Sequence, residues 1–377
     1  MNTKKRYVSL DVLRGLTVAL MIIVNNPGSW SKVFPFLRHA PWDGCTPCDL
    51  VFPFFLFCVG VSMTFAFAKF SSLTGDAFAK VLKRGVLMYL VGLGLTAFPF
   101  YPSQSAMDPG LSFWQNWLRW ASHLRLVGVL ARIAMCYVLG SVLVLWLKRL
   151  ARISAAIGVL SIVYTGGLLL FAGPEGAFSL EGNFARKVDL ALLGENHMYH
   201  GYGVAFDPEG LWGVLTGTCT VLLGYLVGLL VREAGNTSSP ESRTDLSARL
   251  FTLSACSLLS GLILSVWMPI SKPLWSVSYV FYSGGWAMFV FAFLIYVIDV
   301  KGIEKPFMPF KALGMNALAL FVVSGLIMKI LWRYTDWDYT AVFGTNEYMS
   351  LLFALIYLAF HLLLALLLYR KKIFIKL

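Results

Sequence analysis

The stretch LRHAPWDGCTPCDLVFPFF, residues 37–55, places a histidine, two acids and a C-x-x-C pair beside a strongly apolar run. Zinc would require a second ligand pair of that kind, and the sequence has none, so we expect no metal. A redox pair stays open, with weak support outside a thioredoxin-like context. Acid–base chemistry fits better, because a free histidine titrates near neutrality and Asp49 can hold the imidazole of His39 in one tautomer. Pro47 equally indicates the start of a helix at this point.

The composition is that of a membrane protein. Of 377 residues, 58% are hydrophobic and only 13% are charged, with a mean hydropathy of +0.73. A soluble domain of this size needs more polar surface, so we expect a polytopic membrane protein in contact with the lipid bilayer. The net charge of +12 does not indicate nucleic acid, because the basic residues cluster in short segments between apolar runs.

Ten apolar stretches are long enough to cross a hydrocarbon core of about 30 Å, and only helices satisfy their own backbone there. We therefore predict an all-α bundle of about ten transmembrane helices forming one domain over residues 1–377. The predicted spans are 8–26, 47–68, 83–101, 124–147, 152–172, 210–231, 247–268, 276–299, 312–332 and 348–369.

Basic residues also predict the orientation. With a cytoplasmic N-terminus, the inside loops hold nineteen Lys and Arg residues and the outside loops hold seven. Both termini are then cytoplasmic, as is the linker-like stretch near 232–246. The first apolar stretch is preceded by MNTKKRY but lacks a cleavage site, so we expect an uncleaved first span.

Charged groups inside a membrane are costly and therefore informative. Arg14 lies three residues after Asp11, so it either pairs with that acid or holds an anionic ligand from inside. Arg132 lies in mid-span and indicates a functional site. Arg84 lies near a span end, where its charge can reach the interface, and Asn316 can bond to a neighbouring helix.

Two further polar motifs have a structural and a functional interpretation. Asn25 ends the first span, where its amide either caps the helix or faces a cavity. In FDPEGL, Asp207 and Glu209 suit the first turn of a helix, with Pro208 at its first position. Both acids would lie on the outer face, as His39 does.

The sequence resembles the heparan-α-glucosaminide N-acetyltransferase family and its bacterial relatives, within a wider group of membrane acyltransferases. The similar segments extend over nearly the whole chain, in order. They are SLDVLRGLTVALMIIVNNPGSW, LRHAPWDGCTPCDLVFPFFLFCVGVS, RLVGVLARIAMCYVLG, HMYHGYGVAFDPEGL, WMPISKPLWSVSYVFYSGG and KALGMNALALF. The large luminal N-terminal portion of the animal enzymes is not expected in this chain.

This resemblance implies an acetyl-CoA-dependent N-acetyltransferase of a bacterial cytoplasmic membrane. Acetyl-CoA from the cytosol would donate to an amino sugar or glycan on the outer face, and relatives suggest a homodimer. His39 falls on the catalytic base, with Asp49 and Asn25 in supporting roles, and Arg125 and Arg132 fall on the arginines of the family. We expect coenzyme contacts at Arg14, Lys83, Arg84, Arg125, Arg132 and Asn316, and acceptor contacts at Trp42, Asp43, Asp207 and Glu209.

The sequence is compatible with other functions as well. An O-acyltransferase acting on surface glycan hydroxyls has the same donor and a different acceptor. A membrane transporter has the same composition and the same intramembrane charges, but needs no acetyl-CoA. Within the acetyltransferase interpretation, His39 acts either as a general base or as a transient acetyl carrier.

Overall fold

The computed structural model describes residues 7–70, 72–103, 107–237, 240–335 and 337–375. Over these ranges the ordered elements are helices, and the one extended pairing is an isolated bridge between Gly44 and Ser271. The predicted all-α class is confirmed. The long helices are α1 (Val8–Asn25), α2 (Val51–Ala66), α3 (Gly75–Ala97), α5 (Val129–Leu147), α6 (Leu150–Leu170), α8 (Val214–Thr237), α9 (Pro240–Leu264), α10 (Val277–Leu294), α12 (Ala317–Tyr334) and α14 (Glu347–Arg370). The shorter ones are α4 (Phe113–Ala121), α7 (Phe184–Leu192), α11 (Met308–Met315) and α13 (Tyr339–Phe343).

Within the described ranges, nine helical segments are long and apolar enough to cross a membrane, against ten in the prediction. The segment that does not qualify is α3, which replaces the predicted span 83–101. It begins at Gly75, because Thr74 caps it by accepting a hydrogen bond from the amide of Ala77. Its first turns therefore hold Lys80, Lys83 and Arg84, and these charges lower its suitability as a span.

The chain divides into two compact units. Unit 1 comprises residues 1–69, 220–272 and 277–376, and unit 2 comprises residues 70–219 and 273–276. The single domain predicted over 1–377 stays a prediction.

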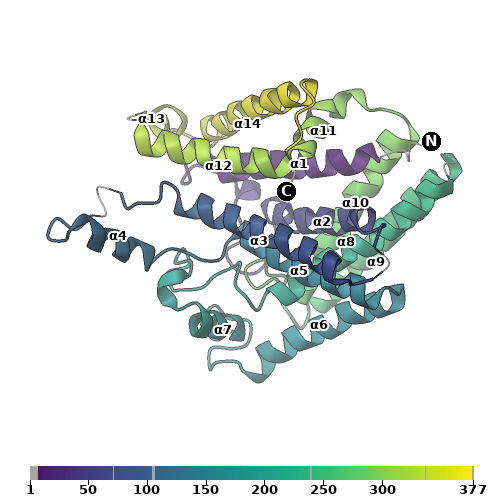
Figure 1. Cartoon of the computed structure of the whole chain (residues 1–377), viewed down its shortest axis with the longest axis horizontal. Helices are drawn as coiled ribbons and strands as arrows, with labels where there is room; N and C mark the ends of the chain where they lie inside the picture. Colours follow the sequence, from purple (N-terminus) through teal and green to yellow (C-terminus); the bar gives the residue numbers. More distant parts are fainter. Residues whose placement is uncertain (1–6, 71, 104–106, 238–239, 336, 376–377) are drawn as a thin grey trace. The chain divides into compact units, whose positions relative to one another are not determined.

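Unit 1 is built around α1, which packs against α2, α10, α11, α12 and α14. Figure 1 shows α12 and α14 lying along α1. The closest approach joins α1 to α11, where Gly15 faces the carbonyl of Phe310 and Gly314 faces the carbonyl of Asp11. A Cβ atom at either glycine would lie within 2 Å of the opposite carbonyl oxygen, so the two backbones are in direct contact.

The predicted span 312–332 is not one continuous helix. It is interrupted at Asn316, where α11 ends and α12 begins. The buried amide of Asn316 donates to the carbonyl of Ile373 and accepts from the amide of Ile375, both from the segment after α14. The side chain thus supplies backbone partners at a helix break inside an apolar region, where unpaired groups would be costly.

The predicted linker near 232–246 is largely helical. Residues up to Thr237 extend α8, and Pro240 opens α9, with Ser238 and Ser239 outside the described residues. Proline suits the first turn of a helix, and Glu241 complements the positive end of the helix dipole. The polar residues near 232–246 therefore mark the end of α8 and the start of α9, and not a long irregular linker.

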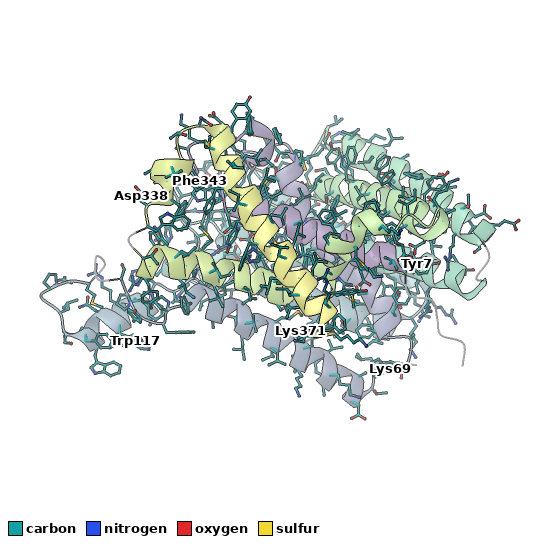
Figure 2. All side chains as sticks on the ribbon, turned by 90° about the horizontal axis from the view of Figure 1, so that it is seen from above. Tyr7, Lys69, Trp117, Asp338, Phe343 and Lys371 are labelled. Carbon is teal, nitrogen blue, oxygen red and sulfur yellow. The ribbon has the colours of Figure 1, made fainter. Side chains whose placement is uncertain are left out.

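In unit 2, α3 lies beside α5, and α6 contacts both α5 and α7 (Figure 1). The short helix α4 carries three tryptophans. Its Trp117, labelled in Figure 2, donates from Nε1 to the carbonyl of Phe100 at 3.0 Å, whereas Trp114 is 68% exposed. Exposed aromatic residues on a short helix suit the interface between lipid and water.

Candidate active site

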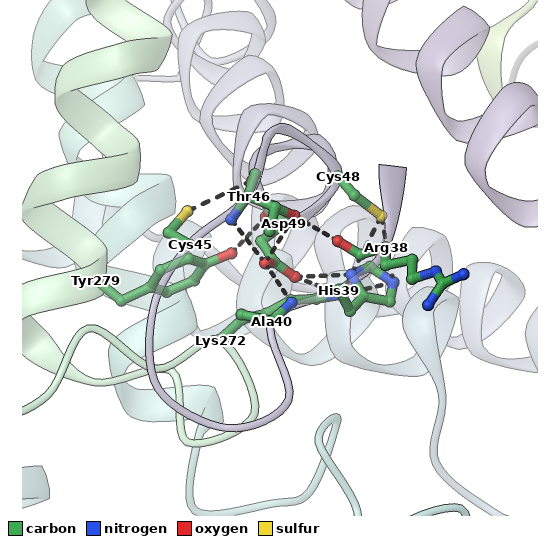
Figure 3. A network of polar contacts seen from close by, with 9 residues as sticks. All are labelled: Arg38, His39, Ala40, Cys45, Thr46, Cys48, Asp49, Lys272 and Tyr279. Atoms are coloured by element: carbon green, nitrogen blue, oxygen red, sulfur yellow. Dashed lines mark hydrogen bonds and ion pairs between the residues drawn. The ribbon is translucent and has the colours of Figure 1, made fainter. Parts of the chain in front are cut away.

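The loop between α1 and α2 holds His39 against Asp49. Nδ1 of His39 lies 2.7 Å from Oδ1 of Asp49, as Figure 3 shows. The Asp49 side chain is 1% exposed, whereas the His39 side chain is 49% exposed. A buried carboxylate therefore orients an imidazole that solvent and ligands can reach, which is the relation between orienter and base in acyl transfer.

The second oxygen of the same carboxylate starts the next helix. Oδ2 of Asp49 accepts from the amides of Ala40 and Thr46, both at 3.0 Å. The hydroxyl of Thr46 lies 3.1 Å from the same oxygen and donates to the carbonyl of Arg38 at 2.7 Å. The Thr46–Asp49 pair forms a capping box on the 3₁₀ turn η2 (Pro47–Leu50), which leads into α2. The hydroxyl of Tyr279, on α10, donates to the carbonyl of Asp49 at 2.6 Å. Helix initiation and imidazole orientation are thus two functions of one side chain.

Lys272 is the residue that sequence analysis missed. Its Nζ lies 3.0 Å from Nδ1 and 3.2 Å from Nε2 of His39, and 3.7 Å from Oδ1 of Asp49. Lys272 is one of the seven Lys and Arg residues counted in the predicted outside loops. A usable signal existed, because Lys272 lies in WMPISKPLWSVSYVFYSGG, one of the segments that carry the family resemblance.

The two cysteines of the C-x-x-C motif are free thiols. Sγ of Cys48 lies 3.2 Å from Nδ1 of His39, and Cys45 donates a weak bond to the carbonyl of Thr46 at 3.6 Å. Burial raises the pKa of Cys45 to about 12, so this thiol stays protonated at neutral pH. Among the described residues, no group of three or more His, Cys, Asp and Glu side chains could hold a metal ion.

The other predicted site residues near this loop differ in how exposed their side chains are. Trp42 is half-buried, and Asp43 is exposed, although partial burial raises its pKa. Asn25 is exposed at the end of α1. The neighbouring Asn26 is buried and donates from its amide to the carbonyl of Ile22 at 2.7 Å, so Asn26 is the residue that caps this helix end.

In unit 2, Arg125 joins the two acids predicted to bind the acceptor. Its guanidinium lies 2.8 Å and 2.6 Å from the two carboxylate oxygens of Asp207 and 2.5 Å from Oε2 of Glu209. Burial lowers the pKa of Arg125, but the ion pairs with Asp207 and Glu209 raise it more, so the net shift is upward. The Arg125 charge is therefore neutralised by two carboxylates of its own unit.

The interpretation of FDPEGL as the first turn of a helix is wrong. The helix α8 begins at Val214, and the segment forms a turn in which Oδ1 of Asp207 accepts from the amide of Glu209 at 3.0 Å. Because Arg125 binds both carboxylates, they are drawn to the arginine and not to a helix end.

Arg132 holds the end of the same segment. Its guanidinium donates to the carbonyls of Gly213 and Pro208 at 2.7 Å and 3.0 Å, and lies over the ring of Trp275. The side chain is 1% exposed. The buried Asp189, on α7, accepts from the amide of Leu211 at 2.7 Å and is a further anchor that sequence analysis did not select.

The remaining candidates for coenzyme contacts fall into two groups. Lys83 and Arg84 are exposed on α3, and Arg84 lies over the ring of Tyr137. Arg14 and Asn316 are engaged within unit 1. Arg14 donates to the hydroxyl of Ser62 at 2.7 Å and lies 3.6 Å from Asp11, which is the pairing that the spacing predicts.

Comparison with known proteins gives a distant relationship. The chain is 26% identical to heparan-alpha-glucosaminide N-acetyltransferase of Mus musculus over 425 residues, covering 100% of this chain and 61% of the relative. It is also 26% identical to the Homo sapiens protein of that name over 424 residues, covering 98% of this chain and 60% of the relative. No family model matches the chain.

The chain has the fold of a multi-pass helical membrane protein and is distantly related to two proteins named heparan-alpha-glucosaminide N-acetyltransferase. It spans about 60% of the length of the curated relatives that it matches.

Proposed function

We propose that the protein transfers an acetyl group from acetyl-CoA to the amino group of a glucosamine-type sugar. The observation that carries this proposal is the pair formed by an accessible His39 imidazole and a buried Asp49 carboxylate at 2.7 Å. The relationship to two proteins named as N-acetyltransferases of heparan-alpha-glucosaminide supplies the reaction type and the class of acceptor.

In the proposed reaction, His39 takes a proton from the acceptor amine as the amine attacks the thioester carbonyl. Asp49 holds the imidazole with its proton on Nδ1, which leaves the Nε2 lone pair for the acceptor. A positioned general base typically contributes a factor of about 10²–10⁴ in rate. Asn25, assigned by resemblance as a supporting residue, is the proposed amide donor to the developing oxyanion.

A variant of this mechanism acetylates His39 first and passes the acetyl group to the acceptor in a second step. The two routes differ in one observable species. Incubation with labelled acetyl-CoA and no acceptor yields a labelled acetyl-imidazole on the protein only in the second route.

We propose that Lys83 and Arg84 contact the phosphate groups of the coenzyme. Both side chains are exposed on α3, so their charges are available to an anion. Arg125 is already neutralised by Asp207 and Glu209, and Arg132 already donates to two backbone carbonyls. These two arginines therefore support the coenzyme site indirectly, by fixing the segment around residues 207–213.

The predicted orientation agrees with this chemistry and belongs to the proposal. With α3 counted as the tenth crossing, both termini lie in the cytosol of a bacterial cell. The basic start of α3 then lies on the side that supplies acetyl-CoA, and His39 lies on the outer side. Trp42 and Asp43 adjoin His39 in sequence and are the proposed acceptor contacts of unit 1. A second copy of the chain is part of the resemblance and is not required by the proposed chemistry.

Transfer from labelled acetyl-CoA tests the proposal directly. Purified protein in detergent is incubated with the donor and with glucosamine, glucosaminides and glycans that offer hydroxyl groups only. We expect label in an amide of an amino sugar, resistant to mild alkali. His39→Ala should abolish this label while the melting temperature stays near that of the wild type.

The rival functions give different results in the same assay. An O-acyltransferase yields an alkali-labile acetyl ester on the hydroxyl glycans and no labelled amide. A transporter yields no labelled product and is not stabilised thermally by acetyl-CoA or CoA. Either result would overturn the proposed function.

A further inference from the structure

The loop that carries Lys272 is fixed beside the His39 loop. The amide of Gly44 donates to the carbonyl of Ile270 at 2.7 Å, and Gly44 forms a bridge with Ser271. The hydroxyl of Ser278, at the start of α10, donates to the carbonyl of Pro269 at 2.8 Å. The backbone before Lys272 is thus held at two points, and its side chain is only 16% exposed.

The contacts of His39 assign its proton. Asp49 Oδ1 lies 2.7 Å from Nδ1 and accepts the proton carried there. The lone pair is then on Nε2. The ammonium of Lys272 lies 3.0 Å from Nδ1 and 3.2 Å from Nε2, so it is a close neighbour of the base.

The ammonium is not needed to satisfy Asp49. That carboxylate already accepts from Nδ1 of His39 and from the amides of Ala40 and Thr46. Lys272 lies at 3.7 Å from Oδ1 of Asp49, farther than from either ring nitrogen of His39. A lysine that served only as a counter-ion would lie closest to the carboxylate.

We propose that Lys272 is a catalytic residue whose ammonium donates a hydrogen bond to the thioester oxygen and stabilises the oxyanion of the tetrahedral intermediate. This inference rests on the proposed acetyl transfer. A reacting atom can lie about 3 Å from both base and oxyanion donor only where the two are neighbours. Lys272 meets this condition, and a charged donor is roughly twice as strong as a neutral amide.

The steps balance without any further reactant. The acceptor amine binds at Nε2 of His39, and the neighbouring ammonium of Lys272 donates to the thioester oxygen. The nitrogen lone pair forms the C–N bond, the carbonyl π electrons move to oxygen, and Nε2 takes the amine proton. The oxygen electrons then re-form the carbonyl, the C–S bond breaks, and the imidazolium returns its proton to the CoA sulfur.

The test compares Lys272→Met and Lys272→Arg with wild type, using full-length protein, labelled acetyl-CoA and glucosamine. We expect Lys272→Met to lower kcat by roughly 10²–10³-fold, the usual cost of losing one oxyanion donor. Both KM values, the melting temperature and the shift of that temperature with CoA should stay close to those of the wild type. Lys272→Arg should restore part of kcat, because it keeps a charged donor. Lys32→Met removes another lysine of unit 1 and should leave kcat unchanged.

Three results would overturn the inference. One is a kcat of Lys272→Met within about threefold of the wild type, where the mechanism requires the loss of a donor. Another is a lower melting temperature in both Lys272→Met and Lys272→Arg, together with the same loss of kcat in the two variants. That result would indicate a structural role for Lys272. If Lys272→Met does not fold, Lys272→Gln takes its place under the same criteria. Wild-type protein that acetylates no acceptor would instead refute the proposed function, and the role of Lys272 would fail with it.

Discussion

Asp49 uses its two carboxylate oxygens for two different tasks. Oδ1 lies 2.7 Å from Nδ1 of His39, and Oδ2 accepts from the amide of Thr46 at 3.0 Å, which closes the first turn before α2. The position of the imidazole is therefore coupled to the start of a helix. A helix end is a rigid support, so the base is held with little freedom.

Replacing His39 by alanine should lower acetyl transfer by at least the factor of about 10²–10⁴ that a general base contributes. The side chain is 49% exposed, so its removal leaves no buried cavity, and the fold should persist. Initial rates with labelled acetyl-CoA measure the first effect, and thermal melting measures the second. Wild-type turnover in this variant would show that His39 is not the catalytic base.

Asp49→Asn should lower the rate of acetyl transfer strongly and the stability of the fold only slightly. The amide oxygen of the asparagine can still accept a hydrogen bond at the helix start. Its nitrogen cannot accept the proton of Nδ1, so the imidazole of His39 is no longer held in one tautomer. Loss of the orienting carboxylate in a serine protease costs roughly 10⁴-fold in kcat, which sets the scale expected here. Asp49→Ala should in addition lose about 0.5–2 kcal/mol with the cap. If both variants transfer acetyl at the wild-type rate, the carboxylate orients nothing.

Arg125→Met should destabilise the protein by about 3–5 kcal/mol, because it leaves two buried carboxylates without their partner. The side chains of Asp207 and Glu209 are 0% and 9% exposed. Combining Arg125→Met with Asp207→Asn and Glu209→Gln should recover much of the loss, as the unpaired charges are then gone. Thermal melting in detergent measures both effects.

A matched control for Arg125 is available in the same unit. Arg119 lies 3.8 Å from Asp108, but the two side chains are 62% and 47% exposed. Exposed ion pairs contribute only about 0–1 kcal/mol, so Arg119→Met should barely change the melting temperature. An equal effect of the two arginine replacements would contradict the structural role of Arg125.

The sequence sufficed for features that depend on neighbours along the chain. His39 and Asp49 are ten residues apart in one loop, so their pairing followed from spacing and residue type. The Asp11–Arg14 pair followed from helical periodicity, and the apolar spans followed from length. Local chemistry of this kind is encoded within a few turns of chain.

Features that depend on distant segments were not accessible in this way. Lys272 reaches His39 because the loop at Ile270 pairs with Gly44, more than 220 positions away. Asn316 interrupts a helix because residues after α14 return to bond its amide. Asp207 and Glu209 form ion pairs with Arg125, although their sequence favours the first turn of a helix. In each case a tertiary partner overrides a local preference.

Asp189 predicts a pH dependence of stability that is independent of catalysis. Burial raises the pKa of its carboxyl to about 7, helped by the negative charge of Asp207, while the amide of Leu211 and the charge of Arg132 lower it. A carboxyl whose pKa is higher in the folded than in the unfolded state takes up a proton on folding. Its contribution to stability therefore falls as the pH rises from about 4 to about 7, and it levels off above.

Asp189→Asn removes this titration and keeps an oxygen that can accept from the amide of Leu211. We expect the variant to melt at a higher temperature than the wild type at pH 8, and at a similar temperature at pH 5. Since 1 kcal/mol moves the melting temperature of a large domain by about 2–4 °C, a difference of several degrees is expected at pH 8. Asp76→Asn, at an exposed position in the first turn of α3, serves as the control. A difference between wild type and Asp189→Asn that is the same at both pH values would show that Asp189 is ionised throughout, because only a proton bound in the folded state makes the difference depend on pH.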